Sequence, residues 1–271
     1  MTAAPDDETS AITASNPRLR TDRPKIAPGF VSLALLVVFL ALWEIAGRAG
    51  LINTFFLSWP SAIGVAAWRI LVSGQLVANL WVTAYAYAIG VVGGCIVGTL
   101  LGLAMGWWRS FGAVIDPFVV FFSAMPRIAL YPVLLMIFGI GDMSRITIVF
   151  IGVVFPVLFN AYVGAKRTPT VLVDVARVFG YSHRRLFTAI VLPSSLPYLM
   201  AGYRTGVTLG MILVVVAEFF GGSSGLGQKI ALTAQLYHTP EMYAWVIYTS
   251  FVAFATVRLM DVVERRVLRW I

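Results

Sequence analysis

The chain has 271 residues, of which 59% are hydrophobic and only 12% carry charge. Soluble domains are about 45–50% hydrophobic and about 25% charged, so this composition excludes an ordinary soluble protein. The formal net charge is +8, from 20 Lys and Arg against 12 Asp and Glu. In so hydrophobic a chain, this excess predicts loops on the cytoplasmic side of a membrane rather than nucleic-acid binding. With Cys95 as its one cysteine and only two histidines, the chain is predicted to hold no disulfide, metal or cofactor.

The apolar runs predict an all-α polytopic bundle of six transmembrane helices. Residues 1–29 are polar and contain four prolines, which predicts a disordered cytoplasmic tail before a membrane domain over 30–271. A basic flank before an apolar run also fits a signal peptide. The first run is long, contains Glu44 and lacks a clear cleavage site, which favours an uncleaved helix. The runs expected to cross the membrane are 30–47, 80–106, 113–139, 145–165, 197–220 and 241–262.

Positive charge outside these runs is unevenly distributed. With six spans and a cytoplasmic N-terminus, the cytoplasmic segments hold most of the Lys and Arg, chiefly in 166–193 and near the two termini. The external segments hold few, among them Arg145 and Lys229. Because loops rich in Lys and Arg stay in the cytoplasm, both termini are predicted to be cytoplasmic.

Two charged residues within the predicted spans are candidates for lining a translocation path. Arg127 lies between Pro126 and Pro132, which interrupt the third span, and Glu218 lies near the outer end of the fifth. A charged side chain at the membrane centre costs about 2.5–3.5 kcal/mol on insertion scales, so its presence suggests a function. For Glu218, a structural hydrogen bond or a side chain reaching for the interface explains the position equally well.

Glycines recur every four residues along the second span. Small residues at this interval let another helix approach closely, and van der Waals contact then holds the pair together. The stripe predicts a helix-packing surface, either a sliding surface near the path or ordinary tight packing inside the bundle. Its members are Gly90, Gly94, Gly98, Gly102 and Gly106.

The segment 166–193, between the fourth and fifth spans, carries signals for two helices. Thr168 is the predicted N-cap of the first helix, and Gly180 is predicted to end that helix. Ser182 predicts the cap of a second helix that stops near Pro193. We interpret the first helix as a knob for a partner's groove, or else as a helix resting on lipid headgroups. Its apolar face is formed by Val171, Val175, Val178 and Phe179.

The same segment resembles the cytoplasmic signature of binding-protein-dependent ABC importer permeases. That signature reads Glu-Ala-Ala, three residues, Gly, nine residues and Ile-x-Leu-Pro. Here Asp174-Val175-Ala176, Gly180 and Ile190-Val-Leu-Pro193 keep every spacing, with Asp for Glu and Val for Ala as departures. Over about 55–262, the chain is also similar to the nitrate/sulfonate/taurine/bicarbonate-type branch. This second similarity rests on Asp116-Pro117, 126–132, Phe138-Gly-Ile-Gly141, Ala217-Glu218 and Gly225-Leu-Gly227.

The resemblance implies a permease subunit of the cell inner membrane, embedded in lipid, that catalyses no reaction itself. The chain lacks a Gly-x-x-x-x-Gly-Lys-Ser/Thr loop for ATP, so two separate ATPase subunits are expected to drive it. A second permease copy in a homodimer and an external substrate-binding protein are also implied. The solute would be a small anion, similar to nitrate, sulfonates, taurine or pyrimidine precursors. In this family the segment docks on the ATPase as a coupling helix, which assigns that contact to Asp174, Val175, Ala176, Arg177, Phe179, Gly180, Tyr181, Ser182, Leu192 and Pro193.

Three other functions fit the sequence less well. An intramembrane hydrolase needs a Ser–His pair or two aspartates on facing helices, but His183 and His238 fall in loops and the aspartates lie near span ends. A self-contained ion-coupled transporter or channel would leave the signature at 174–193 unexplained, and the sequence shows no inverted repeat. An ABC permease for an unrelated solute remains the third alternative.

Overall fold

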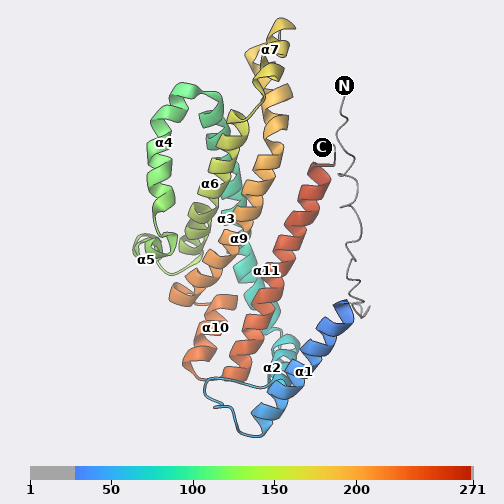
Figure 1. Cartoon of the computed structure of the whole chain (residues 1–271). Coiled ribbons are helices and arrows are strands. Elements are labelled where there is room, and N and C mark those ends of the chain that lie inside the picture. The colour runs from blue at the N-terminus through green and yellow to red at the C-terminus, as the bar shows by residue number, and fades with distance from the viewer. Residues whose placement is uncertain (1–27, 270–271) are drawn as a thin grey trace, which may run out of the picture. The chain divides into compact units, whose positions relative to one another are not determined.

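The computed structural model describes residues 28–269, and helices with short connections make up this range, without a β-strand. Contacts within the chain divide the described residues into two units, 28–43 and 44–269 (Figure 1). The predicted tail, 1–29, lies outside the described residues except for its last two, which begin α1 (Pro28–Arg48). This apolar helix agrees with the first predicted run.

Three long helices form the core of the larger unit: α3 (Gln75–Trp107), α6 (Asp142–Lys166) and α9 (Leu192–Gly221). α6 packs extensively against both α3 and α9 (Figure 1). Val149 and Val153, one turn apart on α6, are fully buried at these contacts. In a membrane such contacts depend on close van der Waals packing, because lipid tails are as apolar as the side chains.

The third predicted span, 113–139, is two helices rather than one. α4 (Arg109–Ala124) is followed by the short η1 (Arg127–Leu130) and by α5 (Tyr131–Phe138). The two arms are bent by 88°. The predicted interruption of this span is therefore confirmed.

The bend follows from one of the two prolines. Met125 is extended, with φ −67° and ψ 136°, because the ring of Pro126 disfavours helical geometry in the residue before it. Pro132 causes no break, since it lies in the first turn of α5, where an N–H has no helical acceptor to lose.

Helix α9 begins earlier than predicted. A short helix, α8 (His183–Leu186), continues through a π-helical turn, η2 (Phe187–Val191), directly into α9. At the junction, the Leu192 N–H donates to the Phe187 carbonyl five residues earlier. The wider π turn accommodates the missing N–H of Pro193, so the prediction that a helix stops near Pro193 is wrong.

Three further helices complete the larger unit: α2 (Pro60–Val72), α10 (Leu226–Gln235) and α11 (Thr239–Val267). α11 packs against α2, α9 and α10. An ion pair of 3.1 Å between Arg204 and Asp261 joins α9 to α11.

Five helices are long and apolar enough to cross a membrane, and the bent pair of α4 and α5 adds a sixth if it counts as one span. The five are α1, α3, α6, the continuous helix from His183 to Gly221, and α11. The predicted all-α membrane bundle is therefore confirmed, with five or six candidate spans where six were predicted.

Candidate functional site

The segment 166–193 forms one end of the larger unit, termed the α7 end, and α10 lies toward the opposite end, termed the α10 end (Figure 1). Its first helix, α7 (Thr170–Val178), begins two residues after the predicted cap, Thr168. Pro169 occupies the N-cap position with φ −58° and ψ 122°. The buried Thr168 hydroxyl has no hydrogen-bond partner within the described residues. The prediction that Thr168 caps this helix is wrong, because the extended Pro169 delays the helix start.

Gly180 ends α7 in the left-handed conformation, with φ +74°. Its N–H donates to the Arg177 carbonyl at 2.9 Å, and the Tyr181 N–H donates to the Ala176 carbonyl at 3.0 Å. These two bonds form a Schellman motif, which satisfies carbonyls at the end of a helix and favours glycine at the left-handed position. The predicted helix end is confirmed.

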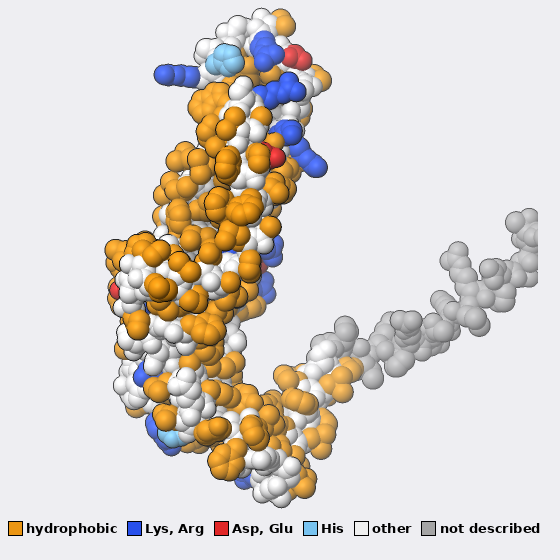
Figure 2. All heavy atoms as spheres, turned by 90° about the vertical axis from the view of Figure 1, so that its left-hand side faces the viewer, with side chains coloured by type: hydrophobic (Ala, Val, Ile, Leu, Met, Phe, Trp, Pro, Cys, Tyr) orange, Lys and Arg blue, Asp and Glu red, His pale blue; other side chains and the backbone are white. Residues whose placement is uncertain are grey.

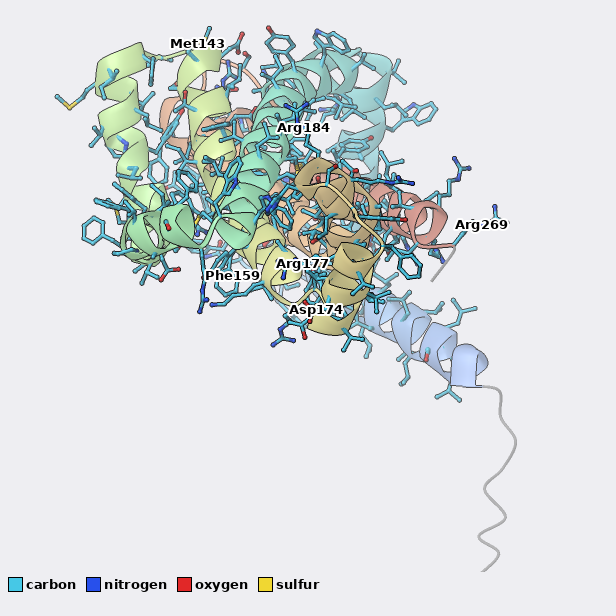
Figure 3. The ribbon with its side chains drawn as sticks, turned by 90° about the horizontal axis from the view of Figure 1, so that it is seen from above. Met143, Phe159, Asp174, Arg177, Arg184 and Arg269 are labelled. Carbon is cyan, nitrogen blue, oxygen red and sulfur yellow. The ribbon has the colours of Figure 1, made fainter. Side chains whose placement is uncertain are left out.

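The apolar face of α7 points away from the rest of the chain. Within α7, Ala176 alone is buried, whereas Val178 is 87% and Phe179 is 77% exposed. Beside this face, Asp174 and Arg177 form an exposed ion pair of 3.5 Å (Figure 3). Four apolar side chains here are between 48% and 87% exposed within the described residues, and we term them the apolar knob: Val171, Val175, Val178 and Phe179.

The helix after the knob is anchored firmly to the core. The Ser182 hydroxyl accepts a hydrogen bond from the Arg185 N–H at 3.4 Å, which confirms the second predicted cap. Leu186 is buried against residues of α6 and α9. The Trp107 ring of α3 lies edge-on to Phe187, with 5.5 Å between centroids. The knob is thus exposed while the segment that carries it is held in place.

Positive charge gathers at the α7 end, around a flank that is otherwise largely hydrophobic (Figure 2). Arg185 lies over the Tyr181 ring, 4.5 Å from its centroid. Such a surface suits acidic partners or anionic headgroups. The exposed cations of the segment are Lys166, Arg167, Arg177, Arg184 and Arg185.

The glycine stripe of α3 faces α6. A Cβ atom added at Gly98 would lie 2.7 Å from the Val154 carbonyl oxygen, and one at Gly94 would lie 2.7 Å from the Val153 Cβ. Both distances are shorter than real Cβ contacts, so only glycine allows this approach of the two helices. This geometry agrees with tight packing inside the bundle, and three more members of the stripe meet α6 in the same way: Gly90, Gly102 and Gly106.

Arg127 lies at the bend between α4 and α5. Its guanidinium is 5.8 Å from the centroid of the Phe155 ring on α6, a cation–π contact. Its Nε atom is buried without a hydrogen-bond partner in the described part of the chain. The side chain therefore has hydrogen-bonding capacity to offer an anion, and its place in a translocation path stays a prediction.

Glu218 is fully buried and lines no open space in this structure. Its Oε1 accepts from the Thr83 hydroxyl at 2.7 Å, and its Oε2 accepts from the Gly227 N–H at 2.8 Å. The Arg145 guanidinium lies 3.7 Å from Oε1. This arrangement is the structural hydrogen bonding that the sequence left open as an alternative to a path residue.

Sequence reasoning misplaced Arg145, the partner of Glu218. It lies in the first turn of α6 with its side chain 4% exposed, so counting it among the external loop charges is wrong. Its guanidinium donates to the Ser224 carbonyl at 3.1 Å and to Asp142 at 2.7 Å. A charge at the edge of an apolar run resembles the start of a loop. The signal that could have found this pair is that Arg145 and Glu218 carry opposite charges, each near the end of an apolar run.

Residues 90–269, well over half of the chain, match the family model of the binding-protein-dependent transport system inner membrane component. The chain belongs to this family. The matched range contains the 166–193 segment, the glycine stripe and both charged candidates, so the candidate site of the permease lies wholly inside the family domain. The family is a transport family of the inner membrane rather than a catalytic one.

Relatives of the permease include the aliphatic sulfonates transport permease proteins SsuC of Bacillus subtilis and Escherichia coli. They are 28% and 30% identical, over 88% and 91% of this chain and 86% and 92% of theirs. The taurine transport system permease protein TauC of Escherichia coli is 25% identical over 89% of each chain. The predicted sulfonate/taurine branch is confirmed.

Solved structures support the same fold. A chain of the MetNI methionine ABC transporter in inward-facing conformations matches with a TM-score of 0.63 at 19% identity, over 71% of this chain and 96% of that one. A chain of an amino acid ABC transporter matches with a TM-score of 0.55 at 16% identity, over 73% of this chain and 96% of that one. The predicted all-α permease fold is confirmed.

Proposed function

We propose that the permease is the membrane-spanning subunit of an ATP-driven importer and that its apolar knob docks on a separate ATPase subunit. The observation that carries the proposal is the exposed apolar face of α7, next to a segment that is packed against the core. Apolar side chains at 171, 175, 178 and 179 follow the i, i+4, i+7, i+8 spacing of a helix that enters a partner's groove. The signature residues 174–193 share this segment, which supports its assignment as the coupling element.

The proposed assembly contains two permease copies, two ATPase subunits and an external substrate-binding protein. The family description names dependence on a binding protein. The chain has no phosphate-binding loop of its own, which supports ATP hydrolysis by a separate subunit. Transport would proceed by alternating access, as ATP-driven closure of the ATPases moves the two knobs.

The proposed solute is a small organic or inorganic anion of the sulfonate or taurine kind. Relatives named for aliphatic sulfonates and taurine support this class, as does the incompletely bonded Arg127 at the α4–α5 bend. A relative of Chloroflexus aurantiacus, 26% identical over 97% of this chain, is named for riboflavin. Because the relatives are named for different solutes, the proposal that the solute is an anion depends most on Arg127.

The docking proposal predicts that Phe179→Asp removes the ATPase from the complex. Burial of a Phe side chain contributes about 1.5–3 kcal/mol, and a buried unpaired carboxylate adds a further penalty. We expect at least about tenfold less ATPase to copurify per permease. As a control, Phe55→Asp changes an exposed Phe in the loop before α2 and should leave the yield of ATPase unchanged. Equal recovery with Phe179→Asp would contradict docking through the knob.

The proposed orientation places both termini and the α7 end in the cytoplasm. In a Cys95→Ser background, a cysteine in place of Leu268 should react only with thiol reagents that cross the membrane. A cysteine in place of the exposed Ser223, at the α10 end, should react with impermeant reagent in intact cells. The reverse pattern would show that the orientation is inverted.

A further inference from the structure

A loop at the α10 end rests on the buried pair of Glu218 and Arg145. The loop, 222–225, reads Gly-Ser-Ser-Gly and has no apolar side chain with which to bind the core. Gly225 has φ +114°, and a Cβ added there would collide with the Glu218 carboxylate. The loop backbone therefore lies directly against the buried carboxylate.

Hydrogen bonds join this part of the chain to all three core helices. From α3, the Asn79 side-chain oxygen accepts from the Gly225 N–H at 3.1 Å, and the Thr83 hydroxyl accepts from the Leu226 N–H at 2.9 Å. From α6, Arg145 holds the Ser224 carbonyl. From α9, Glu218 accepts the Gly227 N–H. Every one of these contacts is buried or nearly so, and α10 begins immediately after them at Leu226.

The same helices carry the coupling segment at the opposite end. α6 ends where the 166–193 segment begins, and the helix that leaves the segment becomes α9. The two helices are closely packed between these ends: a Cβ atom added at Gly202 of α9 would lie 2.9 Å from the Asn160 Cβ of α6. Such packing favours movement of the core as one body. Stability alone does not explain the ionic cluster, because apolar side chains in place of a buried ion pair are often equally stable.

We propose that Glu218 and Arg145 are positioning residues that fix the 222–225 loop and α10 to the core. Engagement of the external binding protein at the α10 end then moves the core and the coupling segment together. The inference rests on the proposed function, which places the binding protein and the ATPase at opposite ends of the permease.

The test uses the assembled transporter with the binding protein carrying an alkanesulfonate as the probe. In Glu218→Gln, the amide can occupy either oxygen position, but its NH₂ then faces the Gly227 N–H or the Arg145 guanidinium. We expect amide hydrogen exchange at 225–227 to accelerate about tenfold or more. Stimulation of ATP hydrolysis by the loaded binding protein should fall about tenfold, while basal hydrolysis and bound ATPase stay within about twofold.

Two further variants make the result decisive. Asn79→Ala removes one loop acceptor and leaves the ion pair in place, and we expect a smaller loss of stimulation, about threefold, with basal hydrolysis retained. Glu241→Gln makes the same chemical change as Glu218→Gln on a partly exposed acid of α11, and it should behave as wild type.

Wild-type stimulation in an assembled Glu218→Gln or Asn79→Ala transporter would overturn the proposal. If Glu218→Gln does not assemble, Asn79→Ala decides by the same two readouts. A purely structural cluster would lower assembly and basal hydrolysis together, which also overturns the positioning role. Failure of the wild type itself to respond to any loaded binding protein would instead count against the proposed function.

Discussion

Gly180→Val should abolish transport while the permease stays folded and inserted. Gly180 holds φ +74°, and a left-handed conformation costs an L-residue roughly 1–2 kcal/mol, with β-branched residues at the unfavourable extreme. Relief of this strain requires the Schellman motif to open, which turns the knob away from its docked direction. We expect transport and stimulated ATP hydrolysis to fall by about tenfold or more, since about 1.4 kcal/mol is a factor of ten.

The matched control for this change is Gly180→Asn. Apart from its chain neighbours, the described residues place no atom within 4 Å of a Cβ added at Gly180, so the backbone angle decides the outcome. Asn tolerates the left-handed region, and it should therefore retain most of the transport that Val loses. Equal activity of the Val and Asn variants, measured as uptake into proteoliposomes with the ATPase present, would show that this helix end is not part of the coupling element.

Both residues that depart from the family signature, Asp174 and Val175, are exposed. Asp174 pairs with Arg177 on the same helix, but the two side chains are 68% and 63% exposed, so the pair adds little to stability. The carboxylate remains available to the partner. Val175, at the position of an alanine in the signature, points outward rather than into the core, where a larger side chain would be costly.

Local chemistry made two helix ends of the 166–193 segment predictable from sequence. Gly180 and Ser182 act within a few residues of themselves, through a left-handed turn and a side-chain cap, so their roles follow from the neighbouring sequence alone. The prediction that Thr168 caps α7 is wrong for an equally local reason. Pro169 is extended, so the cap position moves one residue along the chain, from Thr168 to Pro169. The prediction that a helix stops near Pro193 is wrong because a π turn continues the helix past this proline, and a π turn has no clear sequence signal.

Contacts between distant residues were not predictable in the same way. The spacing of the glycine stripe shows that a helix approaches α3, but it does not say that α6 is this helix. Arg145 and Glu218 are far apart in sequence, and hydropathy treats each as an isolated charge near the end of an apolar run. Only the packing of α3, α6 and α9 brings them together, with the Arg145 guanidinium 3.7 Å from the Glu218 carboxylate.

The glycine stripe leads to the second large effect, which is loss of the assembled bundle in Gly98→Leu. A Cβ at this position would lie 2.7 Å from the Val154 carbonyl oxygen and 2.9 Å from the Val157 Cβ, and a carbonyl of the α6 backbone cannot turn aside as a flexible side chain could. Overpacking of a close contact costs about 1–3 kcal/mol, and a Leu side chain directed at backbone belongs at the upper end. We expect a marked fall in the thermal midpoint of the detergent-solubilised permease and a matching fall in transport.

Two controls separate this contact from the general effects of adding a side chain. Gly64→Leu makes the same change on α2, where an added Cβ meets no other helix within 4 Å in the part of the chain that the structure describes. Leucine favours a helix over glycine by about 0.8 kcal/mol. It should leave the midpoint unchanged or raise it slightly. Val97→Leu alters the residue next to Gly98, on a half-buried part of α3, and should have at most a mild effect. If Gly98→Leu lowers the thermal midpoint as little as both controls do, α3 and α6 separate at little cost in free energy. The stripe would then be a sliding surface rather than the fixed contact of a rigid core.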